Sequence, residues 1–478
     1  MDNGIILRKM IIGATWLAVV CWAAVTMGKP GPDTPNFLIY VSDDHSLLDS
    51  STYGARDIPT PHMDRLARDG VLLNRAFIAS PSCAPSRGAL LTGLMPARNG
   101  AEDNHSYPYS YIKKLPAYLQ ELGYEVAAFG KVAHSKNNQS VGFDFSNGAR
   151  SVPDLRKNVT AYLEQRRSDK PLCLFVGTSN PHVPWPEETT FETEDVMIPP
   201  YHVDTPDTRK FRAMYYQEIR ELDGLLGVLR ELAEKHLGDN TLTVYTSDHG
   251  AQWPFGKWNL YDAGIRIPFI AAWPGVIKSG TATDGMVSWI DILPTLVELA
   301  GGEPPEDIDG RSFAGVLKGE KHEHRNRIFT THSGDRTVNI YPMRSVRTKE
   351  WKYILNLHPE YAYTTHIDLM ISPRSCAYWM TWVEKAKTDT DARRIVNRYH
   401  QRSKEELYYL PADPYEQNNL ALVSEHAGIL RDLRQQVADW MEMQGDDRTT
   451  FHKPFLLTEP DTWKPGKWKA LRMNSTRK

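Results

Sequence analysis

Residues 36–41 form a run of apolar side chains without the polar alternation of a half-buried strand. Such a run is typical of a parallel strand covered by helices on both faces. Similar β-branched or apolar runs occur at residues 71–78, 124–129, 172–176, 241–246 and 267–272. Segments with helical spacing or helix-end signals lie between or after them, at residues 61–69, 115–122, 153–167, 208–236 and 289–299. The alternation predicts an α/β fold with a large, mostly parallel sheet flanked by helices.

The pattern changes after Pro304-Pro305, where shorter strands replace the regular alternation. Residues 343–348 and 351–355 flank Lys349-Glu350 as in a β-hairpin, and residues 425–443 predict a terminal helix. We therefore expect a main domain over residues 33–320, a C-terminal subdomain with a small antiparallel sheet over residues 321–445, and an irregular tail over residues 446–478.

The N-terminus has the composition of a targeting segment. Arg8 and Lys9 precede an apolar run over residues 10–25, and small residues follow it. Residues 1–28 therefore predict a signal peptide and export to a periplasm, the medium or a lysosome-like compartment, depending on the host. A retained membrane anchor is the alternative, because the run approaches spanning length.

Composition narrows the class of protein. The formal charge of −3 argues against a general nucleic-acid binder. Four cysteines are present, of which Cys21 lies in the N-terminal segment and Cys83 in a motif, so Cys173 and Cys376 could form at most one disulfide. Four Asn-x-Ser/Thr sequons begin at Asn104, Asn138, Asn158 and Asn474.

Charged side chains follow the predicted strands directly. Asp43 and Asp44 follow the first strand, and Asp248 and His249 follow the strand at residues 241–246. Open α/β sheets bind ligands at the carboxyl ends of their strands, so these groups should meet. Carboxylates from two strand ends predict a divalent cation site that favours calcium or magnesium over zinc.

Residues 81–93 read Pro-Ser-Cys-Ala-Pro-Ser-Arg-Gly-Ala-Leu-Leu-Thr-Gly. They predict a loop entering a helix, with Pro85 just before the apolar run and Ser86 capping its amides. The string Cys-x-Pro-Ser-Arg followed by Leu-Thr-Gly resembles the signature of the type I sulfatases. That resemblance implies an alkaline-phosphatase-like sulfatase fold and oxidation of Cys83 to formylglycine, an aldehyde whose hydrate can attack sulfur and then expel sulfate.

The same resemblance implies a set of site residues. Gly130-Lys131-Val132-Ala133-His134 is similar to the sulfatase motif whose lysine grips sulfate and whose histidine works on the formylglycine hydrate. Residues 255–268 are similar to the sulfatase segment whose lysine, here Lys257, contacts the bridging oxygen of the ester. The implied catalytic residues are Cys83, Arg87, Lys131, His134, His182 and Lys257. In this scheme His182 and Lys257 assist the leaving group. One calcium ion would be held by Asp43, Asp44, Cys83, Asp248 and His249, although His249 could instead bond a substrate oxygen.

Two later segments, Tyr341–Thr348 and residues 406–420, look most like heparan N-sulfatases. They imply an exported sulfatase that releases sulfate from a sulfated saccharide, with N-sulfoglucosamine of heparan as the first candidate, and a maturase that makes the formylglycine. The sequence leaves open whether the protein forms a homodimer. An O-sulfatase acting on iduronate or another sulfated sugar is the nearest alternative, because the Gly-Lys-x-x-His spacing is closer to iduronate sulfatases. A phosphohydrolase of the alkaline phosphatase superfamily and a non-catalytic glycan-binding protein are the alternatives from other classes.

Overall fold

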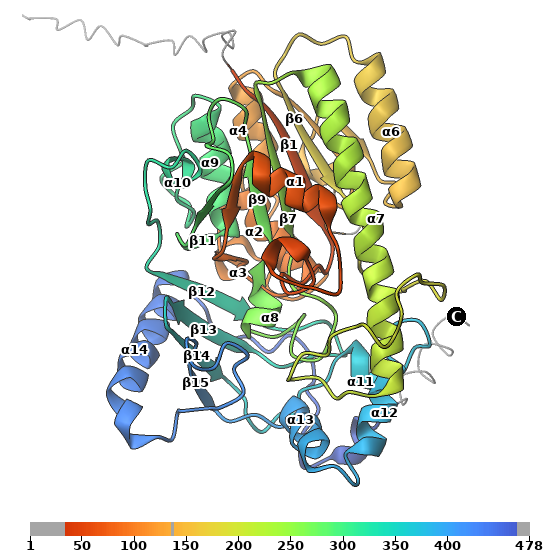
Figure 1. The fold of residues 1–478 in the computed structure, drawn as a ribbon. Helices are drawn as coiled ribbons and strands as arrows, with labels where there is room; N and C mark the ends of the chain where they lie inside the picture. Colours follow the sequence, from red (N-terminus) through yellow and green to blue (C-terminus); the bar gives the residue numbers. More distant parts are fainter. Residues whose placement is uncertain (1–33, 135–137, 466–478) are drawn as a thin grey trace, which may run out of the picture.

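The computed structural model describes residues 34–134 and 138–465 (Figure 1). The predicted signal peptide and residues 466–478 of the predicted tail lie outside these residues. Among the described residues, no helix combines the length and the apolar character that crossing a membrane requires.

The main sheet has eight strands in the order β10-β2-β9-β7-β1-β6-β4-β5 (Figure 1). Their bounds are β1 Asn36–Ser42, β2 Val71–Leu73, β4 Glu125–Gly130, β5 Phe145–Asn147, β6 Leu172–Gly177, β7 Thr241–Ser247, β9 Phe269–Ala272 and β10 Thr281–Thr283. Strand β1 is central and pairs in parallel with β6 and β7. Its side chains are almost all buried, as the apolar run predicts. The predicted α/β sheet is therefore confirmed.

Two predicted strands are each divided between two sheets. Residues 71–78 form β2 and β3 (Ala76–Phe77), and residues 266–272 form β8 (Arg266–Ile267) and β9. Strands β3 and β8 join β11 (Val287–Ser288) in a separate three-stranded sheet. Pro268 stands between β8 and β9, and a proline has no N–H to continue a ladder of hydrogen bonds. The single strand predicted over residues 267–272 is therefore wrong, as is the one over residues 71–78.

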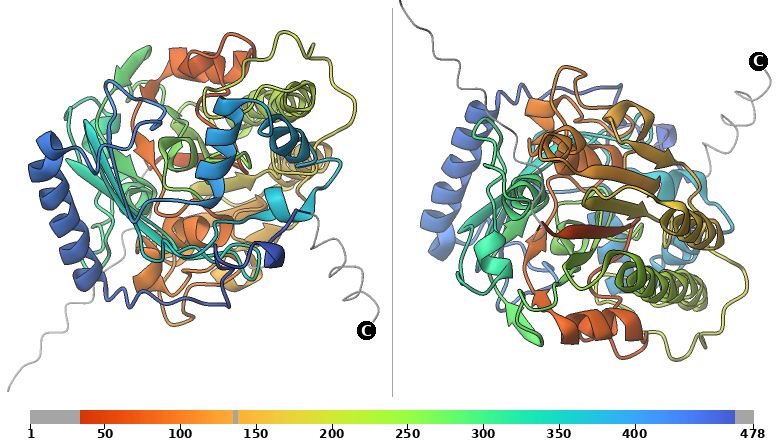
Figure 2. Two further views of the ribbon diagram at one scale, coloured as in Figure 1. Left: turned by 90° about the horizontal axis from the view of Figure 1, so that it is seen from below. Right: turned by 90° about the horizontal axis from the view of Figure 1, so that it is seen from above.

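Helices form two groups around the main sheet (Figure 2). Helices α1 (Pro61–Asp69) and α6 (Val152–Gln165) pack against the long α7 (Pro206–Leu237), and α2 (Cys83–Thr92), α4 (Leu115–Glu121) and α9 (Ile292–Leu299) pack against one another. The remaining short helices here are η1 Ser51–Tyr53, α3 Pro96–Asn99, α5 Asn138–Val141, α8 Asp262–Ile265, η2 Trp289–Asp291 and α10 Ala314–Leu317. The helical segments expected from spacing agree with α1, α4, α6, α7 and α9 to within a few residues.

The C-terminal part contains a four-stranded antiparallel sheet in the order β12-β13-β14-β15. Its strands are Arg327–His332, Met343–Thr348, Trp351–Asn356 and Glu405–Tyr409, so the predicted hairpin is present as β13 and β14. Helices α11 (His366–Met370), α12 (Tyr378–Lys385) and α13 (Thr390–His400) connect β14 to β15. The terminal helix α14 (Ala427–Gln444) follows η3 (Ser424–His426) and packs on β13 and β14, and η4 (Pro460–Thr462) ends the described chain.

Candidate active site

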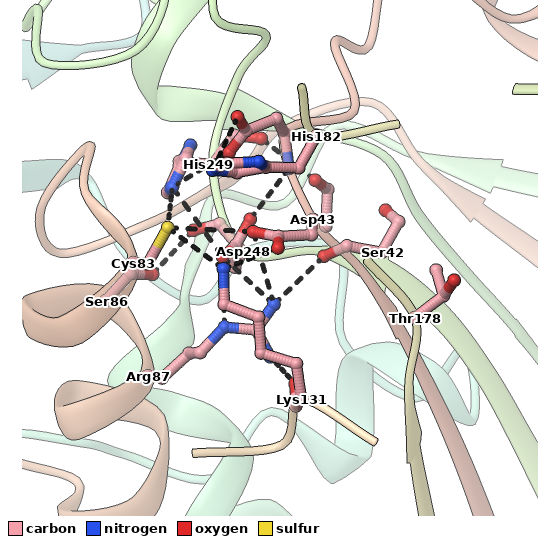
Figure 3. A network of polar contacts seen from close by, with 12 residues as sticks. Ser42, Asp43, Cys83, Ser86, Arg87, Lys131, Thr178, His182, Asp248 and His249 are labelled. Atoms are coloured by element: carbon pink, nitrogen blue, oxygen red, sulfur yellow. Dashed lines mark hydrogen bonds and ion pairs between the residues drawn. The ribbon is translucent and has the colours of Figure 1, made fainter. Parts of the chain in front are cut away.

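The carboxyl ends of β1, β4, β6 and β7 bring the predicted polar residues together (Figure 3). Gly130, the last residue of β4, has φ +73°, and a Cβ there would lie 2.0 Å from the carbonyl oxygen of Gly177 at the end of β6. A side chain at position 130 would therefore clash and strain the backbone. The close approach of the two strand ends delivers Lys131 into the cluster.

Cys83 is the first residue of α2, so the helix begins earlier than predicted. Pro85 lies in the first turn, where a missing N–H breaks no helical hydrogen bond. The hydroxyl of Ser86 donates to the backbone oxygen of Asp248 at 2.6 Å. The prediction that Ser86 caps the helix is therefore wrong, and its side chain instead ties α2 to the end of β7.

The Cys83 thiol is enclosed by charged groups. Its sulfur lies 3.6 Å from Oδ1 of Asp43, 3.3 Å from Nε2 of His249 and 3.3 Å from Nζ of Lys131. Burial raises the pKa of Cys83 to about 12, although Lys131 and Lys257 act in the opposite direction. At neutral pH the unmodified side chain is therefore a neutral thiol and a weak nucleophile.

The other two described cysteines do not form the disulfide that the sequence allowed. Cys173 and Cys376 are both free and buried. The described part of the fold is therefore held together without a disulfide.

Three buried carboxylates each face a buried cation. Lys131 donates to Oδ2 of Asp43, and Nζ of Lys257 lies 2.9 Å from both oxygens of Asp44. Arg87 binds Oδ2 of Asp248 through Nε and Nη2, each at 3.0 Å. Burial alone would raise the pKa of Asp43, yet the charges of Lys131 and its neighbours hold that pKa well below its usual range. Burial raises the pKa of Asp44 in spite of Lys257.

Arg87 is also bound to the backbone around the site. Its Nη1 donates to the carbonyl oxygens of Lys131 and Val132, and its Nη2 lies 3.4 Å from the carbonyl oxygen of Ser42. The guanidinium is fully buried, so its donors serve the protein itself. It joins the ends of β1, β4 and β7 behind the carboxylates.

The donor set fits a divalent cation. One ligand atom from each of five residues, Asp43, Asp44, Cys83, Asp248 and His249, lies within 4.8 Å of all the others. Calcium binds oxygen at about 2.3–2.6 Å, so ligands on opposite sides of the ion are about 5 Å apart. The cluster therefore has the dimensions of a calcium coordination sphere, and its carboxylates are ligands of the appropriate hardness.

His249 supplies further evidence for a cation. Its Nδ1 lies 2.9 Å from the carbonyl oxygen of Gly250 and donates to it, so in the neutral ring Nε2 carries a lone pair. This Nε2 lies 3.4 Å from Oδ1 of Asp44 and 3.6 Å from Oδ2 of Asp248. Burial lowers the pKa of His249, which disfavours a proton between these groups. A metal ion would remove the repulsion between the lone pair and the carboxylates.

His182 faces the same cluster from the loop after β6. Its Nδ1 lies 2.6 Å from the carbonyl oxygen of Val183, and its Nε2 lies 3.8 Å from Oδ2 of Asp44. Burial, with the charge of Lys257, lowers the pKa of His182 to about 3. The ring is therefore neutral near pH 7, with Nδ1 as the donor and Nε2 directed at the cluster.

His134 lies beside Lys131 but contacts a residue that the sequence did not identify. Its Nε2 is 2.7 Å from Nδ1 of His105. Burial, followed by the charge of Lys131, lowers the pKa of His134 to about 2. The structure thus brings Cys83, Arg87, Lys131, His182, Lys257 and the five potential ligands into one cluster, with His134 at its edge.

Sequence reasoning missed the support behind this edge. Oδ1 of Asn104 accepts a hydrogen bond from the Ala84 amide at 3.1 Å, and its Nδ2 donates to Oδ2 of Asp335 at 2.8 Å. In the sequence, Asn104 belongs only to a sequon, and Asp335 lies in an irregular segment after β12 without a motif. The local sequence contains no signal that would identify Asp335. The only signal for His105 is its position in the segment that follows helix α2.

Comparison with known proteins agrees with this geometry. A family model described as Sulfatase matches residues 35–302, and one described as N-sulphoglucosamine sulphohydrolase, C-terminal, matches residues 249–377. An ulvan-active sulfatase of Formosa agariphila is 32% identical over 433 residues, covering 87% of this chain and 81% of the relative. Human N-sulphoglucosamine sulphohydrolase is 28% identical over 475 residues, covering 88% of this chain and 92% of the relative.

The fold is also similar to that of solved structures. One structure, of a protein in complex with its substrate D-glucosamine-2-N,6-O-disulfate, superimposes with a TM-score of 0.67 at 20% identity. The match covers 88% of this chain and all of the other chain. The alkaline-phosphatase-like architecture expected from the sequence is therefore confirmed.

Proposed function

Because the chain belongs to the sulfatase family, we propose that it hydrolyses sulfate from a sulfated saccharide, with N-sulfoglucosamine of heparan or heparin fragments as the first candidate. The main observation behind this proposal is that charged and polar groups from different strands converge around Cys83. Its sulfur lies within 3.3–3.6 Å of a carboxylate, an imidazole and an ammonium group that come from three different strand ends. Sulfuryl transfer places negative charge on sulfate oxygens, and fixed positive charges stabilise it.

The nucleophile in this proposal is residue 83 after oxidation to formylglycine. The hydrated aldehyde supplies two hydroxyls on one carbon, one for attack on sulfur and one whose deprotonation releases sulfate. The unmodified thiol is a poor candidate, because burial raises the pKa of Cys83 to about 12. The first turn of α2 holds this side chain, and the Ser86 bond to Asp248 fixes the helix start against β7.

One calcium ion is the proposed metal, held by Asp43, Asp44, Asp248, residue 83 and His249. It would supply positive charge next to the sulfate oxygens. Arg87 holds Asp43 and Asp248 in place from behind, with 3.7 Å from its Nη2 to Oδ1 of Asp43. We therefore assign Arg87 to organising the carboxylates.

Lys131 and Lys257 are the proposed sulfate-binding cations. Each ammonium group is paired with one of the two adjacent aspartates. A metal shared by Asp43 and Asp44 would weaken both pairs and leave the ammonium groups available to sulfate oxygens. Lys257 also lies 5.1 Å from the centre of the Trp258 ring, which helps to hold its position.

His182 and His134 are the proposed proton carriers. His182 donates through Nδ1 to Val183, so it can act as the leaving-group acid only after Nε2 takes up a second proton. The negative charge of bound sulfate favours that protonation. His134 is neutral and is the proposed base for the release of sulfate.

The choice of saccharide rests on the relatives. The C-terminal family model and the human relative favour an N-sulfated glucosamine, whereas the ulvan-active relative favours a different saccharide, ulvan. The segment Tyr341–Thr348 does not decide between them, because most of it is buried in β13. Arg344 is fully buried and bound to Asp446, so this similarity concerns the framework rather than a substrate contact.

Export through residues 1–28, a formylglycine-generating maturase and a homodimer are proposed on the sequence alone. Formylglycine must form before α2 closes over residue 83, because the folded chain leaves only 2% of Cys83 exposed. The maturase therefore has to act on an unfolded or nascent chain.

The test is sulfate release from a panel of defined compounds. The panel contains glucosamine N-sulfate, glucosamine 6-O-sulfate, 2-O-sulfated iduronate, ulvan oligosaccharides and a phosphate monoester, and released anions are measured by ion chromatography. Cys83→Ala should abolish release, and Cys173→Ala, at a free buried cysteine in β6, should retain it. Release of phosphate alone, or of no anion by protein shown to contain formylglycine, would refute a sulfatase. Preference for an O-sulfate would refute only the sulfamidase.

A further inference from the structure

His134 is the first member of a chain of polar groups that runs away from Cys83. Its Nε2 lies 2.7 Å from Nδ1 of His105, and Nε2 of His105 lies 3.5 Å from Oδ1 of Asp335. Asp335 is fixed through its other oxygen, which accepts hydrogen bonds from Asn104 and from the indole of Trp258, each at 2.8 Å. Three segments distant in sequence therefore meet behind one histidine.

The charge of the carboxylate decides which ring nitrogens of His105 and His134 carry protons. Asp335 is buried, and its contacts with His105, His366 and Asn104 outweigh burial and lower the pKa of its carboxyl, so the group is ionised and can only accept. At 3.5 Å this carboxylate attracts a proton on Nε2 of His105 and would repel a lone pair there, so His105 carries its proton on Nε2 and accepts through Nδ1. His134 in turn donates through Nε2, which leaves its Nδ1 as a bare base.

Two unpartnered atoms agree with this assignment. Among the described residues, neither Nδ1 of His134 nor Oδ1 of Asp335 has a hydrogen-bond partner, and both are buried. A bare buried imidazole nitrogen next to Lys131 is available to a reacting group. The free oxygen of Asp335 is available to a cationic His105, which would need to approach by only a few tenths of an ångström.

We propose that His105 and Asp335 are positioning residues for His134, which fix its tautomer and accept its positive charge when it takes up a proton. This inference rests on the proposed sulfatase function. When Nδ1 of His134 gains a proton, its Nε2 proton passes to Nδ1 of His105, and the charge then lies on His105 beside Asp335. When His134 gives up the Nδ1 proton, the reverse transfer restores both rings.

The charges around the two rings explain why a second histidine is needed. Burial, Lys131, His105 and Arg87 all disfavour a cation on His134, whereas Asp43 favours one. The ring of His105 has the opposite surroundings, with Asp335 against it and 31% of its side chain exposed to solvent. Moving the charge one ring outward takes it from a desolvated site next to a lysine to a partly hydrated site next to a carboxylate.

The backbone at His105 offers substitutions that fold. Its φ is +73°, in the left-handed region that glycine and asparagine adopt readily. His105→Gly should leave a cavity open to solvent, and His105→Asn should fill the site without a relay. Asp335→Asn keeps an acceptor for Asn104 and Trp258 but presents an amide donor to His105, which reverses both tautomers. In serine proteases the corresponding substitution behind the catalytic histidine lowers kcat about 10⁴-fold through the wrong tautomer.

The tautomers can be measured without substrate. In protein labelled with ¹⁵N-histidine, long-range ¹H–¹⁵N spectra should show His134 protonated at Nε2, with the signal assigned by its loss in His134→Asn. The Asp335→Asn variant should shift the proton to Nδ1. A wild-type ring protonated at Nδ1, or no change in Asp335→Asn, would overturn the proposal even if the protein is a sulfatase.

Kinetics on the panel compound that the wild type cleaves fastest give the second readout. His105→Gly and His105→Asn should lower kcat at least tenfold with KM within twofold, and added imidazole should restore the glycine variant but not the asparagine variant. His358→Asn is the matched control, because His358 forms a similar exposed pair with Glu360 at 3.0 Å. Unchanged kcat in His105→Gly, or a raised KM without imidazole rescue, would overturn the relay. If the wild type cleaves nothing in the panel, the proposed function fails and the spectra alone decide the proposal.

Discussion

Replacing Lys257 by methionine should make the stability of the protein depend on calcium. Lys257 is almost fully buried, and its Nζ lies 2.9 Å from both oxygens of Asp44. Methionine keeps the length of the side chain but removes the charge, which leaves Asp44 buried beside Asp43 and Asp248. Removing one partner of a buried pair typically costs about 3–5 kcal/mol of unfolding free energy.

Calcium should return a large part of that loss. The ion replaces the missing positive charge at Asp44, and a ligand at 100 times its Kd stabilises a fold by about 2.7 kcal/mol. The variant should gain more than the wild type at the same calcium concentration, because its Asp44 no longer has an ammonium group that competes with the ion. Catalysis should stay impaired, with kcat lowered about 10²–10³-fold, since one cation at the sulfate is missing.

The assay is urea unfolding followed by tryptophan fluorescence, in a calcium chelator and in excess calcium. Lys352→Met is the matched control, because Lys352 is equally buried and binds Asp262 and Glu416, the latter at 2.8 Å. The control should lose a comparable free energy in chelator and gain from calcium no more than the wild type does. Equal gains in the two variants, or full activity of Lys257→Met, would show that Asp44 and Lys257 do not belong to a metal and sulfate site.

Three further outcomes are expected. Cys83→Ser should accumulate a sulfated form visible by intact-mass analysis or show negligible turnover, and native multiple turnover would exclude the aldehyde mechanism. A chelator should inactivate the enzyme and calcium should reactivate it, whereas zinc should not; full activity of metal-stripped protein would exclude the metal. The ring of His332 binds Asn339, and burial lowers the pKa of His332 to about 4. Stability from this neutral ring is complete above about pH 6.5 and should fall by about 3 kcal/mol as the pH drops through 4. His332→Gln should flatten the dependence of the urea midpoint between pH 7 and 4, and an unchanged slope would contradict the assignment.

The parts of the site that could be predicted are those at the ends of strands. An apolar run that ends in Asp43 or Asp248 identifies both a strand and a charged group at its carboxyl end. Parallel pairing in the sheet then brings these strand ends together. Asp335 could not be found in this way, because its contacts with Asn104 and Trp258 depend on three loops closing together.

Some boundaries of helices and strands that the local sequence pattern predicted were also wrong. Pro268 divides an apolar run between two sheets, and the pairing of the two halves shows which sheet each one joins. Helix α2 begins at Cys83, and the Ser86 hydroxyl has a tertiary partner in Asp248 instead of a capping contact. Pro268 is itself a local signal for the division, whereas the partner of Ser86 cannot be identified from the local sequence.

The pairing of three carboxylates with three cations makes this buried cluster nearly electroneutral before anything binds. A divalent ion would bring the total to about +2, which a sulfate ester or sulfamate, each a monoanion, only half compensates. The liberated dianion compensates it fully. Departure of inorganic sulfate should therefore limit turnover, and sulfate in the medium should compete with the saccharide.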